Sequence, residues 1–248
     1  MDKTAKVVIV MPAFNAAKTL QRTYEEIPST YRGQIILVDD ASSDNTVEVA
    51  KNLGIRVIKH SKNIGYGGNQ KTCYQNALAD GADIIVMIHP DHQYDATVIP
   101  HLVEPLINNR ADAAFGSRML GGHPMEGGMP RWKYIANIFL TAFANVVFQR
   151  YLTEIHSGFR AYSRKYLETV RFEDNSNDFV FDTEIIAQGM SCKLFFTEVP
   201  ISTRYFQGAS SINFLRSTLY GFGILRVLFR YTLHHLKIIS IKQFTPKS

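Results

Sequence analysis

The chain has 248 residues, 46% of them hydrophobic, so it is long and apolar enough to bury one sizeable core, and a disordered chain is disfavoured. The two cysteines, Cys73 and Cys192, lie far apart without a ligand motif, which argues against a disulfide framework or a cysteine zinc site and favours a reducing, cytosolic setting. The formal net charge of +5 divides into −2 for residues 1–198 and +7 for residues 199–248, because no acidic residue follows Glu198.

The first part of the chain alternates apolar runs with helical patterns. The run at residues 7–11 is too short for the apolar region of a signal peptide, so we expect it to be the first strand. A helical pattern and a second apolar run complete a strand–helix–strand unit, and the alternation then repeats. We expect strands at residues 7–11, 34–38, 55–59 and 84–88, and helices at residues 17–27, 42–53 and 69–79. This order predicts a doubly wound, mainly parallel sheet of the α/β class with flanking helices.

Polar residues crowd the end of the expected strand at residues 84–88, which shows no alternation and is therefore expected to be covered on both faces. They are His89, Asp91, His92, Gln93 and Asp95. In such sheets ligands bind at the carboxyl ends of the strands. The carboxylate of Asp91 and the amide oxygen of Gln93 suit a divalent cation that is shared with a diphosphate. The simpler interpretation is a polar turn bent by Pro90.

Two neighbouring acids, Asp39 and Asp40, end the second expected strand. Their carboxylates are placed to accept hydrogen bonds from the ribose or base of a nucleoside. Helix capping is the alternative, although residues 42–44 could do that alone. A dinucleotide-binding domain is disfavoured, because PAFNA at residues 12–16 stands where its glycine fingerprint would follow the first strand. The glycines at 65–68 are expected to form either a tight turn or a ligand loop.

Seven short motifs occur in order along the chain. They are PAFNA at 12–16, VDDASSDNT at 38–46, NIGYGGN at 63–69, HPDHQYD at 89–95, FGSRM at 115–119, SGFRAYS at 157–163 and FDTE at 181–184. Over about residues 5–210 this series resembles the inverting family 2 glycosyltransferases, and it is most similar to the polyprenyl-phosphate (dolichol-phosphate) mannose and glucose synthases. The resemblance implies a GT-A fold, a nucleotide-sugar donor, a polyprenyl phosphate acceptor and a divalent cation, Mg²⁺ or Mn²⁺.

The resemblance also implies roles for individual residues. The nucleotide sugar is expected at Pro12, Ala13, Asn15, Asp39, Asp40, Asn63, Gly65, Asp91, Arg118 and Arg204. The cation is expected at Asp91, Gln93 and His89, and phosphates are expected at Arg118, Arg131 and Arg204. His89 stands where the family usually has an aspartate, and an imidazole ligand would favour Mn²⁺ over Mg²⁺. Two further departures are Ala16 after Asn15, where an acid is common, and Glu154, where an aspartate is common.

The attacking group decides whether a general base is needed. A polyprenyl phosphate is already anionic at neutral pH, so positioning and charge neutralisation would carry the rate, and direct displacement would invert the anomeric centre. A hydroxyl acceptor would need a carboxylate from the FDTE motif or Glu154. The residues expected to act in catalysis are Asp91, Arg118, Arg131, Asp182 and Glu184. The two acids of FDTE could instead anchor its helix by capping and salt bridges.

Two segments lie between these motifs. Residues 119–130 contain four glycines and two prolines, and we expect either a mobile loop over the site or an ordinary disordered loop. Residues 131–152 carry no charge from Tyr134 to Gln149, and we expect a helix that lies in the core, against lipid or over a prenyl chain.

The basic tail, residues 211–248, is expected to be separate from a catalytic domain of residues 1–210. On a helix from 216 to 237, the cations of the tail fall within an arc of roughly 80° beside a wide apolar face. This pattern favours docking on an anionic membrane surface over nucleic acid, for which no motif is present. Packing on the catalytic domain or on a second subunit of a homo-oligomer is the alternative. We therefore expect a cytoplasmic protein that is peripheral at the inner face of the membrane.

Other functions stay open at this point. The acceptor could be a soluble or polysaccharide hydroxyl, and His89 could mark a nucleotide-sugar-binding protein with a degenerate metal site. A nucleotidyltransferase is disfavoured, because the glycine- and lysine-rich loop expected of one is absent after the first strand.

Overall fold

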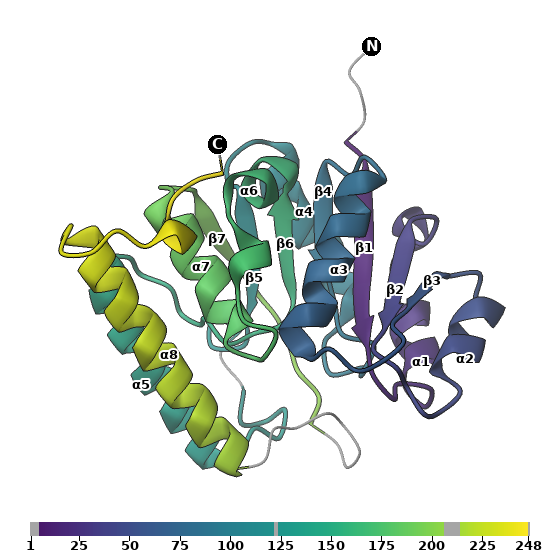
Figure 1. The fold of residues 1–248 in the computed structure, drawn as a ribbon. Helices are drawn as coiled ribbons and strands as arrows, with labels where there is room; N and C mark the ends of the chain where they lie inside the picture. Colours follow the sequence, from purple (N-terminus) through teal and green to yellow (C-terminus); the bar gives the residue numbers. More distant parts are fainter. Residues whose placement is uncertain (1–4, 122–123, 206–213, 248) are drawn as a thin grey trace.

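The computed structural model describes residues 5–121, 124–205 and 214–247. Within these residues a seven-stranded sheet has the order β3-β2-β1-β4-β6-β5-β7 (Figure 1). The strands are β1 (Val7–Ala13), β2 (Ile35–Asp39), β3 (Arg56–Lys59), β4 (Ile84–Met87), β5 (Ala113–Ser117), β6 (Arg160–Ser163) and β7 (Phe196–Pro200). All neighbouring pairs are parallel except those of β6, which runs antiparallel between β4 and β5. The predicted mainly parallel α/β sheet is confirmed.

Helices cover both faces of the sheet, which explains why its central strands are continuous apolar runs. On β1, Val8 and Val10 pack toward the face covered by α3 and α7, whereas Ile9 and Met11 pack toward α1 and α4. The helices are α1 (Leu20–Glu26), α2 (Thr46–Asn52), α3 (Tyr66–Ala79), α4 (Ile99–Ile107), α5 (Arg131–Phe148), α6 (Arg164–Thr169), α7 (Phe181–Ser191) and α8 (Phe214–His235).

Strand β6 carries a charged residue into the centre of the sheet. Arg160 is 1% exposed, and its Nη1 lies 3.4 Å from Oδ1 of Asp182 at the start of α7. The same guanidinium donates to the carbonyl oxygens of Ser157, at 2.7 Å, and Ile155, at 3.0 Å. The buried charge is therefore both paired and hydrogen-bonded, the arrangement under which proteins tolerate a buried ion.

The C-terminal tail forms the expected helix, α8, which packs against α7 and α5. Ile224, Val227 and Leu228 join the main core, and the ring of Tyr231 meets the edge of Phe148 in α5, with 5.0 Å between centroids. The inner apolar face of the tail thus packs on the protein rather than on lipid. The predicted domain boundary at residue 210 lies outside the described residues. In the described ranges, no helix is long and apolar enough to cross a membrane.

The carboxyl ends of the parallel strands meet at the lower edge of the sheet in Figure 1. Helices α5 and α8 also begin at this edge and run away from it side by side. Within the predicted loop at residues 119–130, positions 122 and 123 lie outside the described residues. The later part of the loop lies against the segment after β7, where the Tyr205 N–H donates to the Gly127 carbonyl at 2.8 Å. The edge is therefore bounded by this loop and by the first turns of two helices.

Candidate active site

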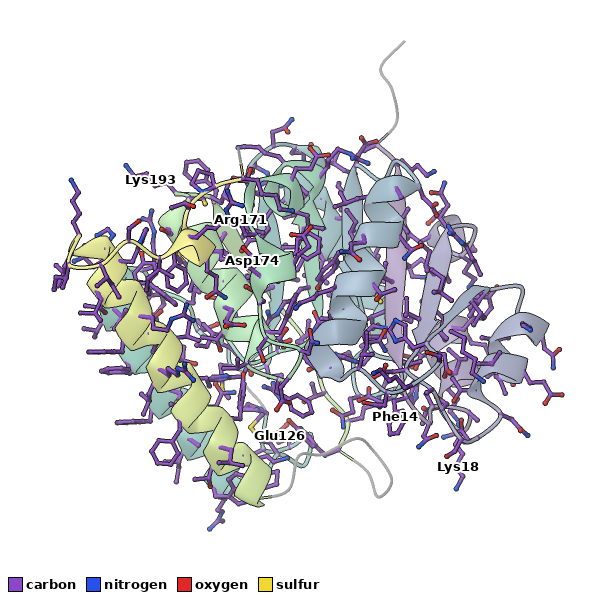
Figure 2. The ribbon with its side chains drawn as sticks, viewed as in Figure 1. Phe14, Lys18, Glu126, Arg171, Asp174 and Lys193 are labelled. Atoms are coloured by element: carbon purple, nitrogen blue, oxygen red, sulfur yellow. The ribbon has the colours of Figure 1, made fainter. Side chains whose placement is uncertain are left out.

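The loops that follow β1 and β2 are tied together at the lower edge of the sheet. Asn15 has a left-handed backbone, with φ 52°, and its side-chain oxygen accepts from the Ser43 N–H at 2.9 Å. The Asn15 N–H donates to the Ser42 hydroxyl and the Ala16 N–H donates to the Thr46 hydroxyl, each at 2.8 Å. Phe14, labelled in Figure 2, projects from this edge and is 55% exposed. Asn15, a predicted donor residue, is therefore also the residue that joins the two loops.

The neighbouring carboxylates of Asp39 and Asp40 are both buried but have different partners. Asp40 accepts from the backbone N–H groups of Ile64, at 2.9 Å, and Gly65, at 3.0 Å, and from the ring of His60 at 2.8 Å. Oδ2 of Asp39 accepts from the Ser42 N–H at 3.1 Å, whereas its Oδ1 has no hydrogen-bond partner among the described residues. Asp40 thus holds the glycine loop in place, and Asp39 retains an unused acceptor.

The glycine loop packs against the segment before α7. The N–H of Gly67 donates to the Asn177 carbonyl at 2.8 Å, and a Cβ on Gly67 would lie 2.4 Å from the Ser176 carbonyl oxygen. Gly65 has φ 91°, a conformation that favours glycine, and Asn63, also a predicted donor residue, donates from its side chain to the Asp40 carbonyl at 3.3 Å. The close contact between the backbone of this loop and residues 176–177 explains why glycines occur here. The same contact brings the start of α7 to the site.

The polar junction after β4 pairs with the segment after β7. Oδ1 of Asp91 accepts from the Gln93 N–H at 3.1 Å, and the Gln93 carbonyl accepts from the Arg204 N–H at 2.9 Å. The guanidinium of Arg204 lies 2.8 Å from Glu26 in α1 and 3.4 Å from Nε2 of His92. The structure therefore brings together three predicted site residues, Asp91, Gln93 and Arg204, and adds Glu26.

A hydrogen-bonded chain leads from His89 to the buried Arg160. The Tyr66 hydroxyl donates to Oδ2 of Asp182 at 2.8 Å and lies 3.2 Å from Nε2 of His89. A phenol has one proton to donate, so with that proton on Asp182 the hydroxyl accepts from His89, whose Nε2 then carries the hydrogen. Burial raises the pKa of Tyr66 well above its ordinary value, and the neighbouring Asp182 carboxylate raises it further. In a neutral His89 this arrangement leaves the lone pair on Nδ1.

Arg118, at the end of β5, is held by Glu154. The Arg118 N–H donates to Oε2 of Glu154 at 2.7 Å, and its Nε and Nη2 both donate to Oε1. Nη1 donates to the Tyr205 hydroxyl at 2.6 Å, and Asn137 of α5 donates to Glu154 at 2.7 Å. Burial alone would raise the pKa of Glu154, but the Arg118 guanidinium and these hydrogen bonds outweigh it and hold the pKa below its ordinary value. The pair is therefore ionised in the folded chain.

The two remaining predicted catalytic residues are Arg131 and Glu184. Arg131 is exposed at the first position of α5. Oε2 of Glu184 accepts from the Ser176 N–H at 2.6 Å, and the residue lines a groove that it shares with Arg226 and Arg230 of α8. Asp182 and Glu184, which are neighbours in the FDTE motif, therefore serve different parts of the molecule.

The residues after β4 offer an incomplete set of metal ligands. No group of three or more His, Cys, Asp or Glu side chains suited to a metal occurs in the part of the chain that the structure describes. Asp91 and the amide of Gln93 supply oxygen atoms, and Nδ1 of His89 has the lone pair that a metal needs. This chemistry fits a cation that takes its remaining ligands from a bound diphosphate and water.

Some residues of the cluster were not predicted from the sequence. Tyr66, Glu26 and Tyr205 each contact a predicted residue, and Arg160 balances Asp182. Tyr66 lies in the motif NIGYGGN and Arg160 in SGFRAYS. Their position in these motifs was the sequence feature that could have indicated a role at the site. Glu26 and Tyr205 lie in no such motif and reach the site only through the packing of α1 and of the segment after β7.

A doubly wound sheet with carboxylates and arginines at one edge is the architecture of GT-A glycosyltransferases. Solved structures of glucosyl-3-phosphoglycerate synthase from Mycobacterium tuberculosis share this fold. One, in complex with Mg²⁺ and UDP, has a TM-score of 0.71 and 17% identity, with 92% of this chain and 79% of that chain covered. Another, with Mn²⁺, UDP and phosphoglyceric acid, has a TM-score of 0.70 and 15% identity over 92% and 78% of the two chains.

The family model for glycosyl transferase family 2 matches residues 8–171. The chain therefore belongs to family 2 and is a glycosyltransferase. A UDP-N-acetylglucosamine–dolichyl-phosphate N-acetylglucosaminyltransferase from Methanococcus voltae is 28% identical, with 80% of this chain and 86% of that protein covered. A dolichyl-phosphate hexose transferase from Haloferax volcanii is 25% identical over 89% of this chain and 93% of that protein.

Proposed function

We propose that the chain transfers a hexose from a nucleoside-diphosphate sugar to a polyprenyl phosphate at a membrane surface, with inversion at the anomeric carbon. The relatives named for dolichyl-phosphate acceptors support the acceptor class. The complexes of the fold neighbours with UDP support a nucleotide-sugar donor. The donor nucleoside would lie at the loops after β1 and β2, and its diphosphate at the junction after β4.

The observation that carries the acceptor assignment is that the candidate general bases are already engaged. Asp182 is bonded to Tyr66 and paired with Arg160, and Glu154 is held by Arg118. The third candidate, in the same motif as Asp182, accepts from the backbone and faces a separate groove. A phosphate acceptor needs no base, because its attacking oxygen is already an anion. For a hydroxyl acceptor, the base would have to leave an ion pair or reach across from the separate groove.

The displacement then depends more on positive charge that neutralises the phosphate groups than on transfer of a proton. An oxygen of the acceptor phosphate forms the new bond to the anomeric carbon as the bond to the donor diphosphate breaks. Arg118 and Arg204 would neutralise the two phosphate groups, and planar guanidinium groups bind phosphate oxygens in pairs. Both are held by carboxylates, so a phosphate would replace Glu154 or Glu26 as their partner.

A divalent cation would be held by Asp91 and Gln93, with His89 as a third ligand through Nδ1. When bound, it would neutralise the charge that develops on the departing nucleoside diphosphate. The chain's own contribution is to hold these side chains at the end of β4. Tyr66 would keep the proton of His89 on Nε2, away from the metal-binding nitrogen.

Sugar transfer in detergent tests the proposal. Purified protein with Mn²⁺ would be given labelled UDP- and GDP-hexoses, together with a polyprenyl phosphate or with the corresponding free polyprenol. We expect transfer to the phosphate and none to the alcohol, with loss of activity in Asp91→Ala and in excess chelator. Transfer to the polyprenol or to a soluble sugar at a similar rate would instead establish a hydroxyl acceptor.

A further inference from the structure

Helix α5 presents an apolar outer face to solvent. Ile135 is 65%, Phe139 66% and Val146 76% exposed, and Phe143 on the same side is also exposed. The polar residues Asn137 and Thr141 instead point inward and are buried. The inner side of the helix is thus partly polar and its outer side largely apolar, unlike an ordinary surface helix, whose outer side is polar. A face of this kind marks an interaction site.

Helix α8 extends this apolar surface. Phe222, Phe229 and Leu236, spaced seven residues apart, are each between 62% and 65% exposed. At about 100° per residue they fall on one side of the helix, opposite the buried Ile224 and Tyr231. Because α8 runs beside α5 with the same direction (Figure 1), the exposed side chains of the two helices form one outer surface, here called the α5–α8 face.

The segments that form the α5–α8 face carry charge of one sign. Residues 127–153 and 214–247 contain nine lysines and arginines and no acidic residue. Among them, Arg150, Arg226 and Lys237 are exposed. A second copy of the chain docked through the same face would bring like charges together, which disfavours a symmetric dimer. An apolar face formed by two helices whose own charged residues are all cations is complementary to lipid with anionic headgroups.

We infer that the α5–α8 face lies on an anionic bilayer, with its aromatic and aliphatic side chains among the headgroups and upper acyl chains. Both helices contribute exposed apolar side chains to this face, whereas the inner face of the tail helix is used for packing on the protein. Both helices begin at the edge of the sheet that carries the site, so this orientation places the site beside the lipid surface. A phosphate on a lipid chain could then reach Arg118 without leaving the bilayer, which is the one point where the inference touches the proposed function.

The single tryptophan of the chain provides a direct readout. Trp132 lies in the first turn of α5 and is 40% exposed. Full-length protein would be mixed with vesicles of phosphatidylcholine alone or with 30% phosphatidylglycerol, a fraction of about that size being enough to give a negative surface. We expect a blue shift of Trp132 emission and quenching by brominated lipid with the anionic vesicles, weakened by salt. An unchanged emission with both vesicles would overturn the inference.

Matched variants identify the surface. We expect Phe139→Ser and Val146→Ser each to weaken vesicle binding about tenfold or more, since each removes a buried apolar side chain from the bound state. Arg226→Gln with Lys237→Gln should weaken it about fivefold per charge. The controls Phe195→Ser and Lys193→Gln make the same exchanges at exposed positions beside β7 and should leave binding unchanged.

Other results would contradict the inference. Equal binding by the α5 variants and the wild type would place the contact elsewhere. A change of molecular mass in Phe139→Ser without a change in vesicle binding would show that a second copy covers the face. Thermal unfolding of each variant checks that the fold is retained. The binding assays contain neither nucleotide sugar nor acceptor. Their outcome therefore tests membrane binding separately from sugar transfer.

Discussion

The two halves of the site edge are held by different kinds of interaction. In the half formed by β1, β2 and β3, side-chain oxygens accept from backbone N–H groups, as Asp40 does from Ile64 and Gly65. In the half formed by β5, β6 and α7, guanidinium groups pair with carboxylates, as in Arg118 with Glu154. Backbone donors cannot change partner unless the loop changes shape, whereas a guanidinium can exchange a carboxylate for a phosphate. The first half is therefore a fixed cradle, and the second can respond to ligands.

The largest effect should come from breaking the buried pair in the second half. Asp182→Asn leaves Arg160, which is 1% exposed, without its counter-charge, and loss of a buried partner costs about 3–5 kcal/mol. Urea unfolding measures this, and Asp80→Asn, which breaks a surface pair with Arg56, is the control and should cost less than about 1 kcal/mol. Full stability combined with a thousandfold lower kcat would instead identify Asp182 as a general base.

The next effect should come from the fixed cradle. Asp40→Asn replaces one of the two oxygens that accept from Ile64 and Gly65 with an amide NH2, which faces a backbone N–H. The Gly65 N–H keeps Asn63 Oδ1 as a second acceptor at 3.1 Å, so we expect a cost of about 1–3 kcal/mol. We expect the glycine loop to loosen and donor affinity to fall with stability. Hydrogen exchange at residues 64–68 measures the loop directly. Unchanged protection of these amides would show that Asp40 does not hold it.

Asp39 gives the matched contrast within the same half. Its Oδ1 has no partner among the described residues, so Asp39→Asn should change the free energy of unfolding by less than about 1 kcal/mol. If the free acceptor serves the donor ribose or base, the dissociation constant of UDP or GDP should rise about tenfold, because a hydrogen bond to a charged group contributes about 1.5–3 kcal/mol. Calorimetric titration decides it, and equal affinity would leave Asp39 without a ligand role.

The last effect depends on pH and concerns His156, which is buried and feels the charges of Glu154, Arg118 and Arg160. Burial lowers the pKa of His156 to about 4, helped by the nearby Arg118 and Arg160 charges against the opposing Glu154. The unfolded chain takes up this proton near pH 6.5, so the folded state loses stability as pH falls from about 6.5 to 4. Between pH 7 and pH 5 the loss should be about 1–2 kcal/mol, and His156→Gln should remove it. An identical pH dependence in the variant would exclude His156 as its source.

Much of the first half follows from sequence pattern, and the second half does not. The four expected strands are β1 to β4, of which β1, β2 and β4 are nearly continuous apolar runs that end in polar turns, whereas β3 has charged residues at both ends. Strand β6 was not predicted, because Arg160 interrupts its apolar pattern. The ion pair with Asp182, a tertiary contact, stabilises this buried charge. Its antiparallel insertion between β4 and β5 has no local cause in the sequence.

The same distinction applies within the site. Asp39 and Asp40 are identical side chains in adjacent positions, and their different partners come from where residues 63–65 fold back. The amphipathic pattern of α8 predicted a helix correctly. Pattern alone could not show that one apolar side of α8 packs on α7 and α5, or that α5 exposes an apolar side to solvent. Local periodicity identifies elements and faces, whereas the choice of partner depends on three-dimensional packing.

The close approach of Gly67 to the segment before α7 has a consequence for how the enzyme tolerates mutation. A methyl group there would lie 2.4 Å from the Ser176 carbonyl oxygen and 2.7 Å from Cβ of Phe181, the first residue of α7. Alanine at this position would displace the helix that carries Asp182. A random loss-of-function screen would therefore recover Gly67→Ala among the inactive clones. The loss would come from the displaced helix and not from a lost contact between residue 67 and the substrate.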